Sequence, residues 1–223
     1  MTVTTRRLAH RGDWRRAPEN SLSAMLAALR VPACDGLEFD VRVSRDDVPV
    51  LLHDATLRRV QHRPERVGEL TAEELAGDEI PALDEVLAAV PVDVFLDAEV
   101  KVDPGPMFVP ILERHRGADG RLTNAVVSSF DVAALDRIGR ERPDWGRWLN
   151  AKSLDESVLR LACDLGCAAV SVEWHAIDER SVGRARVAGL DVAAWTVRGG
   201  STFDRLASLG VVAVCVEGAA LDG

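Results

Sequence analysis

The chain has 223 residues, of which 47% are hydrophobic, so its length allows one large domain with a sizeable core, and we expect residues 1–223 to form a single domain. The formal net charge of −9 and the pI near 5.1 argue against nucleic acid as a partner and against stable association with anionic membranes. Residues 1–7 contain no apolar leader and no run approaches the length of a membrane span, so we expect a soluble, cytoplasmic protein of undetermined oligomeric state.

In chain order, short apolar runs alternate with runs rich in Ala, Leu, Arg and Glu. Nine apolar runs predict strands, at residues 7–10, 36–43, 48–53, 92–100, 125–128, 147–150, 168–172, 191–196 and 211–216. Helices are expected between most of them, at 21–29, 83–89, 106–114, 132–141, 154–165, 179–188 and 202–209. Ser21 and Gly189 stand at helix ends as capping residues. This alternation is typical of a parallel sheet covered by helices.

The spacing of the second and third runs decides the architecture. Only residues 43–47 separate them, which is too short for a parallel crossover, so the two runs should form an antiparallel hairpin. Eight parallel strands then remain, and they predict a TIM-type (β/α)8 barrel with a short hairpin after strand 2. An open doubly wound sheet is the alternative, but no Gly-x-Gly-x-x-Gly follows the first strand.

The second strand carries two carboxylates on one face. Leu37, Phe39 and Val41 alternate with Glu38 and Asp40, so the apolar side chains should face the outer helices while the carboxylates point into the barrel. Two buried carboxylates repel each other unless a cation or a proton lies between them. An ion pair with Arg42 inside a polar barrel layer is the alternative reading.

The strand over residues 92–100 adds further charged side chains. Asp97, Glu99 and Lys101 should point inward, with Glu99 and Lys101 nearest the C-terminal end, where barrel active sites lie. Carboxylates from adjacent strands form a hard oxygen site, which suits one divalent cation, Mg²⁺ or Ca²⁺. Asp97 lies one step deeper and is interpreted as structural.

Two of the five histidines should converge on these carboxylates. His10 ends the first strand, and His53 lies on the returning arm of the hairpin, which brings it back near Asp40. The other three histidines, His62, His115 and His175, are interpreted as packed or surface residues. The four cysteines form no Cys-x-x-Cys pair or Cys/His cluster, so we expect reduced thiols rather than a zinc site.

Short motifs recur in a fixed order along almost the whole chain. They are His10-Arg11-Gly12, Pro18-Glu19-Asn20-Ser21, Glu38-Phe39-Asp40-Val41, His53-Asp54, Glu99-Val100-Lys101, Ser128-Ser129-Phe130 and Trp195-Thr196-Val197. The ordered set resembles the glycerophosphodiester phosphodiesterase family. This resemblance implies a β/α barrel that hydrolyses a small glycerophosphodiester to sn-glycerol 3-phosphate and an alcohol.

The resemblance also implies roles for individual residues. Glu38, Asp40 and Glu99 match the divalent metal ligands, and His10 and His53 match the general acid–base pair. Arg11 and Lys101 match the phosphate contacts, while Glu19 and Asn20 match a segment that supports the first-strand loop. From the residues themselves, Trp195 and Phe130 are candidate walls of the substrate pocket, because each lies at or just past the end of a barrel strand.

Apart from Ser21, which replaces the commoner Thr, two segments depart from the pattern. Arg198-Gly199-Gly200 follows Trp-Thr-Val where an Asn is usual, and Glu217-Gly218 stands where the family more often has Thr-Asp and a Pro. We interpret both as changes at the rim of the pocket, where they would alter specificity for the leaving alcohol.

Three other functions remain open. A lysophospholipase-D-type enzyme would need an apolar surface near the barrel mouth, which the sequence does not indicate. An unrelated phosphosugar enzyme could use residues 198–201 as a phosphate loop, although a tight turn with Ser201 capping the next helix is preferred. A non-catalytic phosphodiester-binding barrel would bind without turnover, and the presence of all five chemical residues argues against it.

Overall fold

A computed structural model describes residues 4–223. Residues 1–3, which belong to the segment 1–7 discussed above, lie outside the described residues. The main sheet contains nine strands. They are β1 (Arg6–His10), β2 (Gly36–Val43), β3 (Pro49–Leu51), β4 (Phe95–Val100), β7 (Ala125–Ser129), β8 (Arg147–Ala151), β9 (Ala169–Glu173), β10 (Asp191–Val197) and β11 (Ala213–Val216). Within the described residues, no helix is both long and apolar enough to cross a membrane.

The sheet closes on itself. Its strand order is β1-β11-β10-β9-β8-β7-β4-β2-β3, and an additional β1–β2 pairing joins the first strand to the second. Every neighbouring pair is parallel except β2 with β3, which pair antiparallel with Val41 opposite Leu51. The predicted TIM-type barrel and its hairpin after strand 2 are therefore confirmed.

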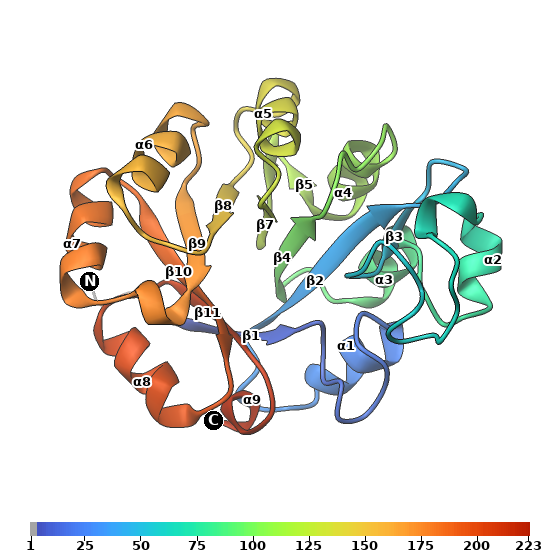
Figure 1. Cartoon of the computed structure of the whole chain (residues 1–223), viewed down its shortest axis with the longest axis horizontal. Coiled ribbons are helices and arrows are strands. Elements are labelled where there is room, and N and C mark those ends of the chain that lie inside the picture. Colours follow the sequence, from blue (N-terminus) through green and yellow to red (C-terminus); the bar gives the residue numbers. More distant parts are fainter. Residues whose placement is uncertain (1–3) are drawn as a thin grey trace.

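Helices surround the barrel (Figure 1). They are α1 (Leu22–Ala28), α2 (Ala72–Ala76), α3 (Leu83–Ala89), α4 (Phe108–Arg116), α5 (Val132–Glu141), α6 (Glu156–Asp164), α7 (Glu179–Val187), α8 (Gly200–Ser208) and α9 (Ala219–Asp222). Ser21 caps α1 by accepting from Ala24 N, and Gly189 follows α7 in the left-handed region at φ 77°, as predicted. The predicted cap at Ser201 is wrong, because α8 begins at Gly200 with Gly199 as its N-cap.

Several short elements escaped prediction. These are α2, α9, the 3₁₀ turns Val67–Glu69 and Trp174–Ala176, and the two-residue strands β5 (Gly117–Ala118) and β6 (Arg121–Leu122). All of them span five residues or fewer, too short for a hydrophobic period to be visible in the sequence.

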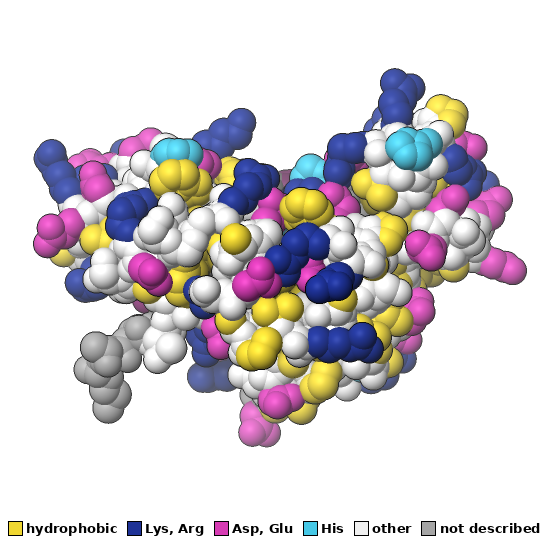
Figure 2. Space-filling view, turned by 90° about the horizontal axis from the view of Figure 1, so that it is seen from below, with side chains coloured by type: hydrophobic (Ala, Val, Ile, Leu, Met, Phe, Trp, Pro, Cys, Tyr) yellow, Lys and Arg dark blue, Asp and Glu magenta, His cyan; other side chains and the backbone are white. Residues whose placement is uncertain are grey.

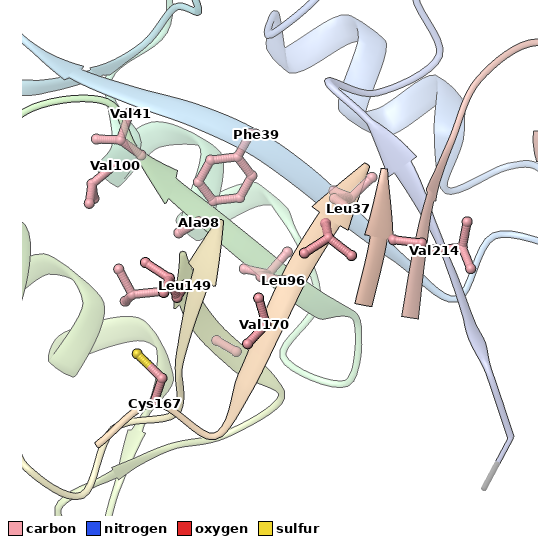
Figure 3. Close-up of a cluster of buried hydrophobic side chains, with 14 of the residues drawn as sticks. Leu37, Phe39, Val41, Leu96, Ala98, Val100, Leu149, Cys167, Val170 and Val214 are labelled. Atoms are coloured by element: carbon pink, nitrogen blue, oxygen red, sulfur yellow. The ribbon is translucent and has the colours of Figure 1, made fainter. Parts of the chain in front are cut away.

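The alternation of β2 and β4 divides their side chains between two faces. Leu37, Phe39 and Val41 are fully buried among the helix-facing side chains, as predicted. Figure 3 shows Phe39 and Val41 beside Ala98 and Val100 of β4, which are their register partners. The same register sets Glu38 beside Asp97 and Asp40 beside Glu99 on the inner face.

Candidate active site

The loop after β1 places His10 and Arg11 at the barrel mouth. Arg11 N donates to Glu38 O at 2.8 Å, and the chain then turns through left-handed φ angles of 59° at Arg11 and 80° at Gly12. A Cβ on Gly12 would lie 2.6 Å from the carbonyl carbon of Ala24, so glycine is required where the loop rests on α1.

Three buried carboxylates meet inside the barrel. Glu38, Asp40 and Glu99 each offer an oxygen, and these oxygens lie within 4.8 Å of one another. Burial, followed by the charges of Asp40 and Glu99, raises the pKa of Glu38 well above its usual value. Burial and the charge of Asp40 likewise raise the pKa of Glu99. Full ionisation of the cluster is therefore costly without a compensating cation.

The cluster fits a hard divalent cation. All three candidate ligands are carboxylates, the donor type that Mg²⁺ and Ca²⁺ prefer. Glu38 Oε1 is buried and finds no hydrogen-bond partner among the described residues, so it has an unused lone pair. Arg42, the alternative partner for these carboxylates, instead donates Nε to His53 O at 2.8 Å.

Asp40 is held by its neighbours. Asn20 donates Nδ2 to Asp40 Oδ2 at 2.8 Å and accepts from Asp40 N at 3.1 Å. Lys101 Nζ lies 2.8 Å from Oδ1 and also pairs with Glu99, while Arg11 Nε lies 3.0 Å from Oδ2. Burial alone would raise the pKa of Asp40, but the charges of Lys101 and Arg11 hold it below its usual range. This carboxylate is thus ionised even when its neighbours are protonated.

Glu19 connects two arginines. It pairs with Arg11 at 3.0 Å and with Arg59 at 2.5 Å. Burial opposes its ionisation, but the Arg59 hydrogen bond and the Arg11 charge lower its pKa. The predicted supporting segment therefore reaches both the β1 loop and, through Arg59, the loop after β3.

Both histidines lie beside the carboxylate cluster. His10 Nε2 lies 3.7 Å from Glu38 Oε2. His53 follows β3, where Leu52 N donates to Asp40 O at 3.0 Å, so the hairpin returns it beside Asp40 as predicted. Burial lowers the pKa of His53, although the charge of Asp40 opposes this shift.

One cavity of about 240 Å³ brings these groups together. Phe130 and Trp195 form one side of it, with ring centroids 5.6 Å apart at 73°. Trp195 Nε1 donates to Ser171 O at 3.1 Å, which fixes the indole. The predicted site residues that line the cavity are His10, Arg11, Glu38, His53, Glu99, Lys101, Phe130 and Trp195.

The remaining predicted residues lie just outside the cavity or on its inner surface. Asp40 is fully buried behind the lining, and Glu19 and Asn20 hold Arg11 and Asp40 from outside. Asp97, interpreted as structural, also lines the cavity, and burial raises its pKa to about 7.

Sequence reasoning missed the contacts behind the histidines. Glu217, which the sequence places at the rim, is only 8% exposed and lies 2.5 Å from His10 Nδ1. It also pairs with Arg198, the other residue at which this chain departs from the family pattern. The signal in the sequence was that both departures lie directly after neighbouring strands, β10 and β11.

Comparisons with known proteins agree with this geometry. Residues 10–219 match the model of the Glycerophosphoryl diester phosphodiesterase family. A glycerophosphodiester phosphodiesterase of Caldanaerobacter subterraneus is 32% identical over 153 residues, which cover 61% of this chain and 62% of that protein. YhdW of Bacillus subtilis is 27% identical over 94% of this chain and 93% of its own length.

Solved structures share the fold. The Oleispira antarctica phosphodiesterase OLEI02445, solved in complex with the product sn-glycerol-3-phosphate, superposes with a TM-score of 0.84 at 25% identity, covering 96% of this chain and 93% of that one. The glycerophosphodiester phosphodiesterase of Thermotoga maritima gives a TM-score of 0.79 at 22% identity, covering 98% and 96% of the two chains. With its closed barrel, its carboxylate–histidine cavity and a family match over nearly its full length, the chain belongs to the glycerophosphoryl diester phosphodiesterase family and is a phosphoric diester hydrolase.

Proposed function

We propose that this protein hydrolyses glycerophosphodiesters to sn-glycerol 3-phosphate and an alcohol, and that residues 1–223 act as one domain. The observation that carries the proposal is the single cavity in which two imidazoles, two cationic side chains and a carboxylate cluster meet. The related Oleispira phosphodiesterase, which binds sn-glycerol-3-phosphate as its product, supports the substrate class.

Glu38, Asp40 and Glu99 would hold one divalent cation, Mg²⁺ or Ca²⁺. When bound, such a cation supplies electrostatic stabilisation for negative charge on the phosphoryl oxygens. Arg11 and Lys101 line the cavity beside these carboxylates and would bind the same oxygens from the protein side. The charges of both side chains, which are mostly buried, are matched to an anionic substrate.

The protons would move through the two imidazoles. One imidazole takes the proton of the attacking hydroxyl, and the other gives a proton to the leaving alkoxide. We favour attack by a glycerol hydroxyl of the substrate, which yields a cyclic phosphate that water then opens, because two imidazoles flanking a phosphorus serve this route without an enzyme nucleophile. Histidine suits both roles because its pKa lies near neutrality.

The test is release of glycerol 3-phosphate from several glycerophosphodiesters, with and without a chelator. We expect release that stops on chelation and returns with Mg²⁺ or Ca²⁺, and a cyclic glycerophosphate that can be trapped at early times. His10→Ala and His53→Ala should each abolish release while the circular dichroism spectrum stays unchanged. Activity that persists in either variant would sink the assignment of that histidine.

One observation favours a second substrate class, the lysophospholipids. Met107 and Val102 on the loop after β4 and Phe130 after β7 are exposed apolar side chains on segments that follow the C-terminal ends of barrel strands. Of these three side chains, however, only Phe130 lines the cavity. On the side of the molecule that Figure 2 shows, hydrophobic side chains lie among acidic and basic ones. Comparing lysophosphatidylcholine with glycerophosphocholine separates the two classes, and we expect faster turnover of the water-soluble diester.

A further inference from the structure

A carboxylate and an arginine lie behind His10. Glu217 Oε1 is 2.5 Å from His10 Nδ1, and Glu217 Oε2 is 2.8 Å from Arg198 Nη2. His10 and Glu217 are 207 positions apart in the sequence. They meet because β1 and β11 are parallel neighbours, and each residue directly follows or ends its strand at the same end of the barrel. We call Glu217 and Arg198 the first support.

Glu217 can only accept a hydrogen bond in this position. Burial alone would raise its pKa, but the hydrogen bond to His10 and the charges of His10 and Arg198 lower it below the usual value. An ionised carboxylate has no proton to donate. The proton in the contact therefore sits on Nδ1 of His10, and in the neutral imidazole the lone pair is on Nε2.

The same arrangement stands behind His53. Asp54 Oδ1 is 2.6 Å from His53 Nδ1, and Arg59 Nε donates to Asp54 Oδ2 at 2.7 Å. Arg59 is itself anchored on Glu19. Burial opposes ionisation of Asp54, but hydrogen bonds from Arg59 and His53 lower its pKa. We call Asp54 and Arg59 the second support.

The two supports come from unrelated segments, one after β10 and β11 and the other after β3, yet they place identical chemistry on the same ring atom. A hydrogen bond on one imidazole nitrogen determines the tautomer and the orientation of the ring. In each case an arginine occupies the second carboxylate oxygen, so the carboxylate cannot rotate away from the ring without breaking an ion pair. Both histidines line the cavity while their Nδ1 atoms are taken.

We propose that the two supports are positioning devices, which keep the proton on Nδ1 of each histidine and turn Nε2 toward the substrate. The proposal rests on the proposed proton transfer by His10 and His53. None of the four support residues lines the cavity, so their effect on proton transfer passes through the two rings.

The kinetic test uses Glu217→Gln and Asp54→Asn, which keep size but remove the charge that requires a donor on Nδ1. We expect kcat to fall by about 10–100-fold in each variant. We expect KM to stay within about twofold, because the orientation of the imidazole affects proton transfer, and hence kcat, but not substrate binding.

The chain offers a matched control. Asp84 lies 2.7 Å from His115 Nε2 and also pairs with Arg114, so it forms a carboxylate–histidine–arginine group of the same composition on α3 and α4. None of these three residues lines the cavity. Asp84→Asn should leave kcat unchanged.

A spectroscopic readout separates positioning from mere packing. Imidazole ¹⁵N shifts, recorded on Mg²⁺-saturated protein at about pH 8, above the ordinary histidine pKa of about 6.5, report which nitrogen carries the proton. His10→Asn and His53→Asn identify the two signals. We expect Nδ1–H tautomers in the wild type, and a substantial Nε2–H population at His10 in Glu217→Gln and at His53 in Asp54→Asn.

Two results would overturn the proposal: a loss of kcat no larger than in the control, or an unchanged tautomer in the support variants. If Glu217→Gln does not fold, Arg198→Met serves instead, because the Arg198 side chain is largely exposed and its loss frees Glu217 to rotate. A wild type without phosphodiesterase activity would refute the proposed function, whereas the tautomers would still decide whether the supports fix the rings.

Discussion

At the scale of single residues, Asp40 receives more direct contacts than its neighbours in the carboxylate cluster. It accepts hydrogen bonds or charge from Asn20, Lys101 and Arg11, and its side chain is completely buried. The contact with Asn20 fixes both its carboxylate and its backbone N–H. The direction of this side chain is therefore set before any cation binds.

Asn20→Ala should weaken both stability and cation binding. The substitution leaves Asp40 N without its acceptor and removes one of the two contacts of Asp40 Oδ2, the other being Arg11 Nε. This costs about 1–3 kcal/mol of unfolding free energy, and cation affinity should fall by about 10–100-fold. Urea unfolding and calorimetric titration with Mg²⁺ measure the two effects.

Asn124→Ala is the control. Asn124 also has a left-handed backbone, with φ 47° against 60° for Asn20, but its side chain donates to Val92 O rather than to a carboxylate of the cluster. Equal cation affinity in both variants would refute a role for Asn20 in orienting the ligand.

Lys101→Met should reduce catalysis. Lys101 is mostly buried, and its charge faces Asp40 and Glu99 at the cavity wall. Removing one preorganised cationic contact should lower kcat by about 10²–10³-fold. Steady-state kinetics on a glycerophosphodiester check this, with Lys152→Met as the control, because the exposed Lys152 does not line the cavity. Similar rates in the two variants would contradict the assignment.

Residue patterns predicted the cavity more fully than its surroundings. Glu38, Asp40 and Glu99 were predictable because strand alternation fixes the side on which each side chain emerges. The partners of His10 were not, because the contact with Glu217 depends on the closing register of β1 with β11 and on a side-chain rotamer. The contact of His53 with Asp54 is local, but adjacent residues in sequence do not reveal a hydrogen bond.

At the scale of elements, Arg116 ties α4 to the segment before β4. It is the last residue of α4, is 1% exposed, and donates to the carbonyl oxygens of Val90, Pro91, Val92 and Val94. These carbonyls are therefore satisfied by a side chain rather than by a neighbouring strand. This explains why β4 begins at Phe95, although the apolar run predicts a strand from residue 92.

Arg116→Lys should destabilise the protein by about 2–4 kcal/mol, because a single ammonium cannot reach the four carbonyls that the guanidinium fork serves. Unfolding in urea measures the loss. Arg140→Lys on α5, where the side chain is 74% exposed, should change stability by less than about 0.5 kcal/mol. If the two substitutions cost the same, the carbonyl contacts of Arg116 contribute nothing net.

At the scale of the whole molecule, stability should depend on pH through the carboxylates inside the barrel. Burial raises the pKa of Asp97 to about 7 from the usual 3.8. The folded chain therefore binds this proton more tightly than the unfolded chain, so its stabilising effect is full below about pH 4 and is lost as pH rises through 7. Chelated protein should thus lose stability between about pH 5 and 8.

The loss of stability is measured as the fall in melting temperature between about pH 5 and 8 in the presence of a chelator. In Asp97→Asn the melting temperature should fall less over the same pH range. Saturating Mg²⁺ should raise the melting temperature more at pH 8 than at pH 5, because the ligands must be deprotonated to bind it. An equal fall in Asp97→Asn and in the wild type would show that other groups control the transition.

The barrel itself was predictable because the spacing of the strand runs left one arrangement open. Residues 43–47 were too short for a crossover, which forced the hairpin and left eight parallel strands. The short helix α2 was not predicted, although Thr71 and Glu74 form a capping box at its start. A capping box without a following apolar period does not distinguish a one-turn helix from a loop.

The pairing of β1 with β11 has a consequence for the order of events during synthesis. A nascent chain that has been translated only through β10 already contains both histidines and all three clustered carboxylates, but its sheet is still open and His10 lacks its partner Glu217. Because the N-terminal end of a domain leaves the ribosome first, the active site would be completed only at the end of synthesis, when β11 pairs with β1. A premature stop just before residue 213 would then leave a polypeptide with most of its reactive groups and no working enzyme.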